Sequence, residues 1–307
     1  MKVLFVGIGS IGTRHLKNLT AVCKQRNIDL EVTALRSSTR ELPGETAQLI
    51  CRQITQPDDT VYDLAFITNP TNLHHSAIKQ LVGKVKFFFI EKPIFEDCVY
   101  SLDELGLTDK NAYVAAPMRY CGAYMKLKEI IRDIPAYSVR IICSSYLPGW
   151  RPNADYRKVY SAIRAMGGGV TIDLIHELDY MVDLFGFPLE SFNFKGTYSH
   201  LEMDSDDLSV YIARYKDKLC EVHLDYFGRT YRRTCEVFTK DGTIVADFGA
   251  GTVTLADGTV IDCTEDVNER FVREIGNVLD IMNGRAENIN TPDKANRVLA
   301  LTLGKEI

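Results

Sequence analysis

Three glycines at the start of the chain have the spacing of a dinucleotide-binding turn. The segment Gly7–Gly12 reads G-x-G-x-x-G and directly follows the apolar run Lys2–Gly7. In this pattern the first glycine permits a tight turn, the second lets backbone N–H groups approach a pyrophosphate, and the third lets a helix pack closely on its strand. Small residues also form ordinary tight turns, but here a helix-compatible run, Thr13–Cys23, follows as the motif requires. We therefore expect a dinucleotide to bind at Gly7, Gly9, Ser10, Ile11 and Gly12.

The residues after the second predicted strand favour NADP(H) over NAD(H). An enzyme that uses NAD usually ends this strand with Asp or Glu, whose carboxylate accepts hydrogen bonds from the ribose 2′-OH. Here the strand is followed by Arg36-Ser-Ser-Thr-Arg40, and the acids Asp29 and Glu31 come too early to serve. A cation with neighbouring hydroxyl groups suits a 2′-phosphate. We therefore expect Arg36 and Ser37 to bind the phosphate of NADP(H).

Three further segments carry polar residues at positions where ligands usually bind. Thr68-Asn-Pro-Thr-Asn-Leu-His74 follows the fourth predicted strand, and Glu91-Lys92-Pro93 follows the fifth. Ligands of open α/β sheets meet the carboxyl ends of the strands, which favours a functional Lys92 over a merely solvated lysine. The third segment is Gly167-Gly-Gly169-x3-Asp173-x2-His176-x2-Asp179.

The third segment is predicted to open a helix. Its glycines could form a plain flexible loop, and we interpret them as a close approach of the backbone to substrate or nicotinamide. Asp173 and His176 are three residues apart, a spacing that places two side chains on one helix face. In isolation His176 would more often be a core or surface histidine.

The first 120 residues alternate apolar strands with helical segments, which is typical of a doubly wound parallel sheet. Near-continuous apolar runs such as Phe87–Ile90 fit strands covered on both faces. Helical patterns between the strands include His74–Val82 and Ser101–Leu105. The predicted strands are Lys2–Gly7, Leu30–Leu35, Leu49–Ile54, Leu64–Thr68, Phe87–Glu91 and Tyr113–Pro117. We therefore expect residues 1–120 to form a Rossmann domain.

From residue 121 onward, a helix at Met125–Ile131 is followed by strands of alternating pattern. Asp241-Gly242 and Asp257-Gly258 are typical of hairpin turns. The predicted strands are Tyr137–Tyr146, Phe192–Tyr198, Leu208–Tyr215, Leu219–Tyr226, Arg232–Thr239 and Thr243–Asp247. Such a run predicts a large, mostly antiparallel open sheet with one face toward solvent or an interface.

Two closing helices are predicted at Val267–Met282 and Asp293–Leu303, the second with Thr291 as its N-cap. We expect residues 121–307 to form an α+β domain for substrate binding and oligomerisation. Packing of the terminal helix back onto the first domain is an alternative.

The composition excludes several classes of protein. With 307 residues, 46% of them hydrophobic, the chain is long enough for one or two domains with ample cores. A net charge of −5 argues against nucleic acid or an anionic membrane as a partner. The eight cysteines show no metal-type spacing and fit a reducing compartment, and no apolar stretch approaches the length of a membrane span. We expect a cytoplasmic protein without a metal site.

Taken together, the four motifs resemble those of the glucose–fructose oxidoreductase / inositol dehydrogenase (Gfo/Idh/MocA) family, over essentially the whole chain and in the right order. The stretch from Tyr156 to Pro188 is most similar to members associated with bacterial surface-sugar pathways. The resemblance implies a Rossmann domain that binds NAD(H) or NADP(H), an α/β domain with an open sheet, and hydride transfer at a sugar or polyol carbon.

The resemblance also assigns catalytic roles. Lys92 matches the family's catalytic lysine, and a cis peptide bond often precedes Pro93 there. Asp173 and His176 match the acid and the histidine of the second domain, although many members separate the two by one more residue. Imidazole titrates near neutral pH, so His176 is the expected general base for the substrate hydroxyl. Lys92 would stabilise the developing alkoxide, and Asp173 would orient Lys92 or His176.

Further contacts are expected on both sides of the site. On the cofactor side they are Thr68, Asn69, Pro70, His74, Glu91 and Lys92. On the substrate side they are Arg119, Trp150, Arg151 and Tyr156, because aromatic faces suit sugar C–H surfaces and arginines suit phosphate. A solvated loop is the alternative for residues 150–160.

These expectations combine into an NAD(P)-dependent oxidoreductase acting on a sugar, a polyol or a sugar nucleotide. A redox-neutral sugar enzyme, such as an epimerase that recycles its cofactor, is a variant within the same class. A dinucleotide-binding redox sensor without turnover is the alternative from another class, because fold alone does not determine function. One apolar face of the wide sheet would be exposed in a monomer, which predicts a homodimer or homotetramer.

Overall fold

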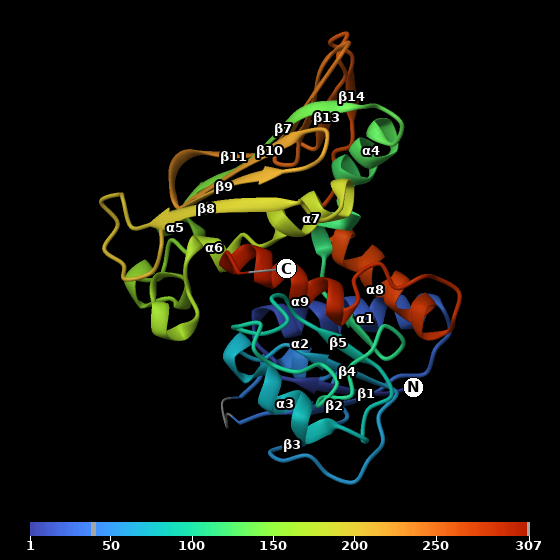
Figure 1. The fold of residues 1–307 in the computed structure, drawn as a ribbon. Coiled ribbons are helices and arrows are strands. Elements are labelled where there is room, and N and C mark those ends of the chain that lie inside the picture. The colour runs from blue at the N-terminus through green and yellow to red at the C-terminus, as the bar shows by residue number, and fades with distance from the viewer. Residues whose placement is uncertain (38–40, 306–307) are drawn as a thin grey trace. The chain divides into compact units, whose positions relative to one another are not determined.

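The computed structural model describes residues 1–37 and 41–305, which form two compact units (Figure 1). Unit 1 consists of Met1–Pro117 and Phe271–Leu299, and unit 2 consists of Met118–Arg270 and Ala300–Ile307. Ser38, Thr39 and Arg40 of the predicted phosphate-binding segment lie outside the described residues. Unit 1 contains a parallel sheet with helices, and unit 2 contains a large, mostly antiparallel sheet, so the predicted fold class is confirmed.

The sheet of unit 1 has six parallel strands in the order β3-β2-β1-β4-β5-β6. The strands are β1 (Lys2–Val6), β2 (Glu31–Leu35), β3 (Arg52–Ile54), β4 (Leu64–Ile67), β5 (Phe88–Ile90) and β6 (Ala112–Val114). The strand order reverses between β1 and β4, and ligands of such sheets bind at the carboxyl ends of the strands beside this reversal. Both of these strands are buried, and Phe5 stacks on Phe66 at 4.5 Å between ring centroids.

Helices before and after unit 2 in the sequence complete unit 1. They are α1 (Ser10–Gln25), α2 (Gly44–Ala47), α3 (His74–Leu81), α8 (Glu269–Met282) and the first part of α9 (Pro292–Leu303). Glu274 of α8 is fully buried and accepts hydrogen bonds from the Tyr113 hydroxyl (3.0 Å) and the Ala116 N–H (2.6 Å). The predicted N-cap at Thr291 is confirmed, because its hydroxyl accepts the Lys294 N–H at 3.2 Å.

One predicted helix of unit 1, Ser101–Leu105, is wrong. The segment forms turns, with the Glu104 N–H on the Ser101 hydroxyl and the chain reversing at Gly106, whose φ is +62°. Five residues give too few intrahelical hydrogen bonds to offset the cost of starting a helix, so local side-chain bonds decide the conformation.

The sheet of unit 2 has eight strands in the order β14-β13-β12-β11-β7-β10-β9-β8. The strands are β7 (Ala136–Tyr146), β8 (Glu190–Gly196), β9 (Leu208–Arg214), β10 (Leu219–Asp225), β11 (Phe227–Thr239), β12 (Gly242–Asp247), β13 (Thr252–Thr254) and β14 (Val260–Asp262). The pair β7–β10 is parallel and the other pairs are antiparallel. The sequence prediction lacked β13 and β14, because three-residue strands carry too little alternation to be recognised.

The helices of unit 2 are α4 (Gly122–Ile131), α5 (Leu147–Trp150), α6 (Val170–Asp173) and α7 (His176–Phe185), with single turns at Tyr156–Lys158, Tyr160–Ala162 and Arg164–Met166. The expectation that Asp173 and His176 share one face of a single helix is wrong. Asp173 ends α6 and His176 begins α7, because the backbone leaves helical geometry at Leu174 (φ −97°, ψ 29°).

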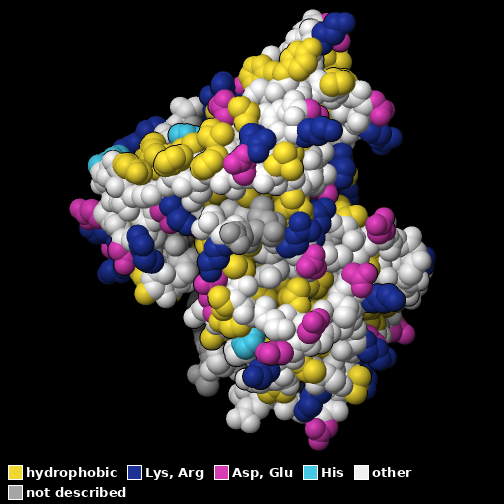
Figure 2. Space-filling model, viewed as in Figure 1, with side chains coloured by type: hydrophobic (Ala, Val, Ile, Leu, Met, Phe, Trp, Pro, Cys, Tyr) yellow, Lys and Arg dark blue, Asp and Glu magenta, His cyan; other side chains and the backbone are white. Residues whose placement is uncertain are grey.

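The two faces of this sheet differ in character. Inward side chains such as Val139, Tyr211 and Val222 are fully buried, whereas Phe192 and Phe194 of β8 are 55% and 67% exposed. Hydrophobic side chains gather along the upper left of the view, over β8 and β9 (Figure 2). In the described part of the chain, no helix has both the length and the apolar character to cross a bilayer.

Candidate functional site

The three glycines of the turn in unit 1 have different surroundings, which bear on the three roles that the sequence pattern predicts. A Cβ atom on Gly7, whose φ is +90°, would lie 2.9 Å from Asn69 Cα, and one on Gly12 would lie 2.5 Å from the Gly7 carbonyl oxygen. These two glycines are therefore required by the packing of the chain itself. A Cβ on Gly9 would point into open space, with nothing within 4 Å. Gly9 leaves room for a ligand against the backbone.

Helix α1 offers its N-terminus beside this turn. Its N-cap residue is Gly9, which has no side chain to cap the first turn, and none of the residues in that turn is acidic. The helix continues for sixteen residues. The N–H groups and the helix dipole at such an end favour a negatively charged group. The residues present therefore fit the pyrophosphate of a dinucleotide.

Two clefts of unit 1 meet at this turn. The first, of about 580 Å³, is lined by the turn, Arg36 and Ser37, and residues 41–43. The second, of about 490 Å³, is lined by the turn, the carboxyl end of β2, Thr68-Asn69-Pro70 and one side of α3. Both volumes are of the size that binds a small ligand. The structure thus brings together most of the predicted cofactor residues, and Thr68 also donates to the Gly7 carbonyl at 2.7 Å.

Arg36 has neighbours that the sequence prediction did not consider. Its guanidinium donates to the Gln53 side chain at 2.7 Å, and Glu41 lines the same cleft. Glu41 lies six residues past the end of β2, too far along the chain for the pattern at the strand end to reveal it. The first cleft therefore contains both a cation and a carboxylate.

His74, a predicted cofactor contact, does not line either of these two clefts. It is 1% exposed. Its ring nitrogens lie 3.0 Å from the Asn69 carbonyl and 3.1 Å from the Ile94 carbonyl. Burial lowers the pKa of His74 below its ordinary value. The ring therefore connects the segments that follow β4 and β5, and the structure favours a positioning role.

Glu91 and Lys92 follow β5, with a cis peptide bond between Lys92 and Pro93 as the resemblance implied. One oxygen of Glu91 lies 2.5 Å from His15 Nε2, and the other accepts the Lys92 N–H at 3.1 Å. Burial would raise the pKa of Glu91, but His15 and Lys92 outweigh it and hold the pKa below its ordinary value. The Glu91 carboxylate is therefore ionised, and both of its oxygens form hydrogen bonds within unit 1.

In unit 2, Asp173 is 4% exposed and is held by a residue that the sequence prediction missed. The hydroxyl of Tyr226, itself fully buried, donates to Asp173 Oδ2 at 2.5 Å. Burial and the charge of Asp173 raise the pKa of Tyr226 far above its ordinary value, so the phenol stays protonated and donates. The only hint in the sequence is that a tyrosine follows an acid directly after the apolar part of β10.

His176 begins α7 and is half-buried. Two of the three glycines before α6, Gly168 and Gly169, are required by contacts within unit 2, whereas Gly167 has a φ of +83° and open space around an added Cβ. A Cβ on Gly168 would collide with the Tyr160 carbonyl, and one on Gly169 (φ +127°) would lie 2.5 Å from Asp206. The Asp206 carboxylate in turn caps α6 by accepting the Thr171 N–H at 2.9 Å.

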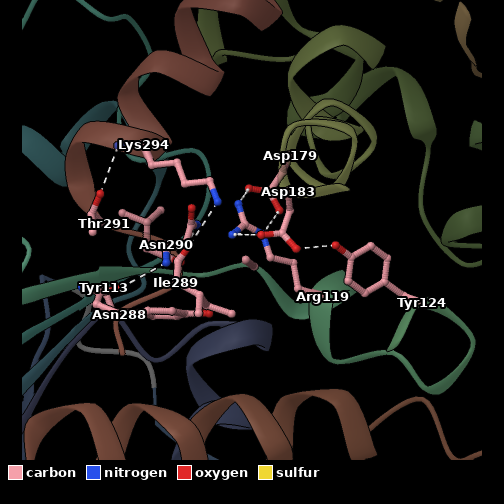
Figure 3. Close-up of polar contacts among 12 residues, drawn as sticks. Tyr113, Arg119, Tyr124, Asp179, Asp183, Asn288, Ile289, Asn290, Thr291 and Lys294 are labelled. Carbon is pink, nitrogen blue, oxygen red and sulfur yellow. Dashed lines mark hydrogen bonds and ion pairs between the residues drawn. The ribbon is translucent and has the colours of Figure 1, made fainter. Parts of the chain in front are cut away.

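Arg119, a predicted substrate contact, is instead buried among carboxylates (Figure 3). Its guanidinium forms two hydrogen bonds to Asp179, at 2.6 and 2.9 Å, and one to Asp183 at 3.0 Å. Asp183 also accepts from the Tyr124 hydroxyl and from Lys128. Burial would raise the pKa of Asp183, but these partners hold it well below its ordinary value. The cluster joins α7 to the segment that opens α4.

The three other predicted substrate residues share one cavity in unit 2. Trp150, Arg151 and Tyr156 line a space of about 130 Å³ with Leu147, Val159, Tyr160 and Ser161. The indole of Trp150 packs edge-on against Tyr226, with 5.3 Å between ring centroids, and donates to the Ser145 hydroxyl at 3.1 Å. One aromatic ring therefore connects this cavity to Asp173.

Comparison with known proteins shows similarity to oxidoreductases that have an NAD-binding Rossmann fold. Residues 1–105 match the model of the oxidoreductase family with an NAD-binding Rossmann fold. Myo-inositol 2-dehydrogenase of Thermotoga maritima is 24% identical over 261 residues, which cover 80% of this chain and 75% of that relative.

Two solved structures share the fold over almost the whole chain. Levoglucosan dehydrogenase, in complex with NADH and levoglucosan, aligns with a TM-score of 0.82 at 17% identity, over 99% of this chain and 95% of that one. UDP-N-acetylglucosamine 3-dehydrogenase from Acidithiobacillus ferrooxidans aligns with a TM-score of 0.74 at 18% identity, over 99% and 95%. The glycine turn, the family model over residues 1–105 and the shared fold agree, so the resemblance to the Gfo/Idh/MocA oxidoreductases that the motifs indicated is confirmed.

Proposed function

We propose that the protein is an NAD(P)-dependent oxidoreductase that transfers hydride between nicotinamide and a secondary alcohol or ketone of a sugar, a polyol or a sugar nucleotide. The observation that carries the proposal is the glycine turn, which lies at a helix N-terminus beside two clefts. The resemblance assigns the catalytic positions to Lys92, Asp173 and His176. The relatives named for inositol, levoglucosan and a UDP-sugar support the class of substrate.

The residues of the chain have distinct tasks in this proposal. The bound nicotinamide would supply the hydride chemistry. His176 would take the hydroxyl proton in oxidation and return it in reduction. Lys92 would donate a hydrogen bond to the reacting oxygen and favour its anionic form. Asp173, held by Tyr226, would contribute a fixed negative charge and orient its neighbours.

The finer assignments follow the sequence. We propose NADP(H) as the preferred cofactor, because Arg36 and Ser37 line the first cleft. We propose a cytoplasmic enzyme with neither nucleic acid nor membrane as partner, on the basis of the net charge of −5 and eight free cysteines.

A redox sensor that binds the dinucleotide without turnover remains the second candidate. Lys92, Asp173 and His176 favour the oxidoreductase over the sensor, because a sensor would not need these three side chains. A sensor would bind the cofactor tightly and turn over none of the substrates offered.

Turnover and cofactor affinity, measured separately, test the proposal. Lys92→Ala and His176→Ala should lower kcat by on the order of 10²–10⁴ on a substrate found in a panel of sugars, polyols and nucleotide sugars. Both variants should keep the cofactor Kd, read from the fluorescence of bound NADPH. Gly9→Val should do the reverse, because its side chain would occupy the open space beside the turn.

Two exposed residues supply matched controls. Lys86→Ala and His200→Ala remove the same side-chain types from the surfaces of units 1 and 2 and should leave kcat unchanged. Full turnover in both Lys92→Ala and His176→Ala would show that the catalytic assignment is wrong.

A further inference from the structure

We propose that His15 and Glu91 act as a positioning pair that fixes the main chain of Lys92 and connects it to the helix whose N-terminus receives the cofactor's pyrophosphate. The proposal rests on the proposed function, since it assumes that Lys92 contacts the substrate. It assigns a role to His15, which no motif of the sequence analysis used, and a different role to Glu91 from the predicted cofactor contact.

The geometry of the pair is continuous from α1 to Lys92. His15 lies on α1, one turn past Gly12, and its side chain is fully buried. Its Nε2 lies 2.5 Å from one oxygen of Glu91, whose side chain is 12% exposed. The other oxygen of Glu91 accepts the Lys92 N–H at 3.1 Å. The carboxylate therefore receives one hydrogen bond from the cofactor helix and one from the backbone of Lys92.

Aromatic rings surround His15 on its other sides. Phe89, Phe66 and Phe271 lie with their ring centroids 4.8, 5.7 and 6.0 Å from the imidazole. Its second nitrogen, Nδ1, is buried and has no hydrogen-bond partner among the residues that the structure describes. A polar ring placed in an apolar box costs stability unless it makes a specific bond. The bond to Glu91 is the one that this position provides.

The charges that face Glu91 come from three places in unit 1. His15 of α1 and the neighbouring Lys92 both favour the ionised carboxylate and outweigh the effect of burial on its pKa. His74 of α3 is the third titratable group that interacts with it. Removal of His15 alone would leave a buried carboxylate with one donor fewer, which raises its pKa. Protonation of Glu91 would then weaken its hold on the Lys92 N–H at acidic pH.

The test compares His15→Phe, His15→Gln and Glu91→Gln in the full-length protein, with kcat, KM and the NADPH Kd measured between pH 5 and 9. His15→Phe fills the aromatic box but donates no hydrogen bond. We expect kcat to fall by on the order of 10²-fold, because misplacement of a catalytic group by about 1 Å has that effect. The pH profile should also gain a second acidic limb, in addition to the one that protonation of His176 gives the unaltered protein. The NADPH Kd should stay nearly unchanged, and His15→Gln, whose amide can donate to Glu91, should recover most of kcat.

Removal of the Glu91 carboxylate shows whether His15 acts by positioning Glu91 or only by filling space. Glu91→Gln keeps the shape but cannot ionise, so the double variant His15→Phe/Glu91→Gln should lack the second acidic limb and keep that of His176. His75→Phe, a histidine on α3 that stacks on Tyr100 at 4.1 Å, is the matched control and should leave kcat unchanged.

Two results would overturn the pair. One is an unchanged kcat and pH profile in Glu91→Gln and in whichever His15 variant folds. The other is a loss in His15→Phe that is uniform across pH and is not recovered by His15→Gln. Failure of the proposed function looks different, because then either the unaltered protein turns over no substrate or Lys92→Ala retains full turnover, whatever the His15 variants do.

Discussion

The buried hydroxyl of Tyr226 holds Asp173, which we propose as a catalytic residue. Tyr226→Phe removes the oxygen that donates to Asp173 and leaves the ring against Trp150 in place. Removal of a donor from a buried acceptor costs about 1–3 kcal/mol. If that energy orients Asp173 for the reaction, kcat should fall roughly 5- to 100-fold while the cofactor Kd stays constant.

Tyr180 of α7 supplies the matched control for this prediction. Its hydroxyl is buried and has no hydrogen-bond partner among the described residues. Tyr180→Phe therefore removes an equivalent atom that holds nothing, and steady-state kinetics should show no change. Equal kcat values for Tyr226→Phe and the unaltered protein would rule out a positioning role for Tyr226.

We expect Arg36 to set the preference between the two dinucleotides. Arg36→Ala should weaken NADPH binding by about tenfold or more, because a charge-assisted hydrogen bond contributes about 1.5–3 kcal/mol, and it should barely affect NADH. Fluorescence titration with both cofactors measures this. The control is Arg52→Ala, which removes from β3 an arginine that forms an ion pair with Asp58. NADH bound as tightly as NADPH by the unaltered protein would contradict the prediction and point instead to Glu41 as a partner of the ribose.

Sequence reasoning described the backbone well where the spacing of residues itself encodes a conformation. The glycine turn has this property, because its spacing encodes a conformation and a close approach. It failed where a side chain of suitable chemistry is used by distant partners: Arg119 by Asp179, and His74 by two carbonyl groups. Those partners become neighbours through the tertiary fold, so no local pattern reveals them.

At the scale of the elements, the cluster around Asp183 stabilises the contact between α7 and the start of α4. Because the pKa of Asp183 is lowered in the folded state, its contribution is fully present above the unfolded value of about 3.9 and is lost as the pH falls through the folded value. Asp183→Asn should therefore lower the free energy of unfolding by about 1–3 kcal/mol at pH 7, and the difference should shrink below about pH 4.

Chemical denaturation of both proteins at several pH values measures this difference. Asp241→Asn, in the exposed turn between β11 and β12, is the control and should follow the unaltered protein at every pH. A difference for Asp183→Asn that is independent of pH would mean that the charge of Asp183 does not contribute.

The predictability of the elements follows from their length. All six predicted strands of unit 1 and all six predicted strands of unit 2 overlap observed strands, because their apolar patterns extend over several residues. The largest difference is at β11, which begins at Phe227 instead of Arg232. The short elements were lost: β13 and β14 are defined by their pairing, and the break between α6 and α7 is a change at a single residue, Leu174.

At the scale of the whole molecule, the exposed face of the large sheet predicts self-association. Phe192 and Phe194 lie on this face together with the partly exposed Val210 and Ile212 of β9, and apolar patches of this kind usually mark interfaces. We expect a homodimer or homotetramer in light scattering at micromolar concentration. Phe194→Asp should shift the mass toward the monomer, because it would bury an unpaired charge in the interface.

Val99 of unit 1 provides the control for the assembly. It is 72% exposed and lies outside this sheet, so Val99→Asp should leave the mass unchanged. A monomeric mass for the unaltered protein would contradict the assignment of the sheet as an interface.

The return of the chain to unit 1 after unit 2 has a consequence for biosynthesis. Strand β6 and the residues after it form hydrogen bonds with residues that are synthesised much later. Glu274 accepts hydrogen bonds from the Tyr113 hydroxyl and the Ala116 N–H, and Asn290 donates one to the Val114 carbonyl. A ribosome that has released only the first 117 residues has therefore not yet delivered the groups that close this edge of the sheet. The nascent Rossmann segment lacks these hydrogen-bond partners until Glu274 and Asn290 have emerged. A product that ends before them would be a substrate for chaperones and proteases rather than a working nucleotide-binding module.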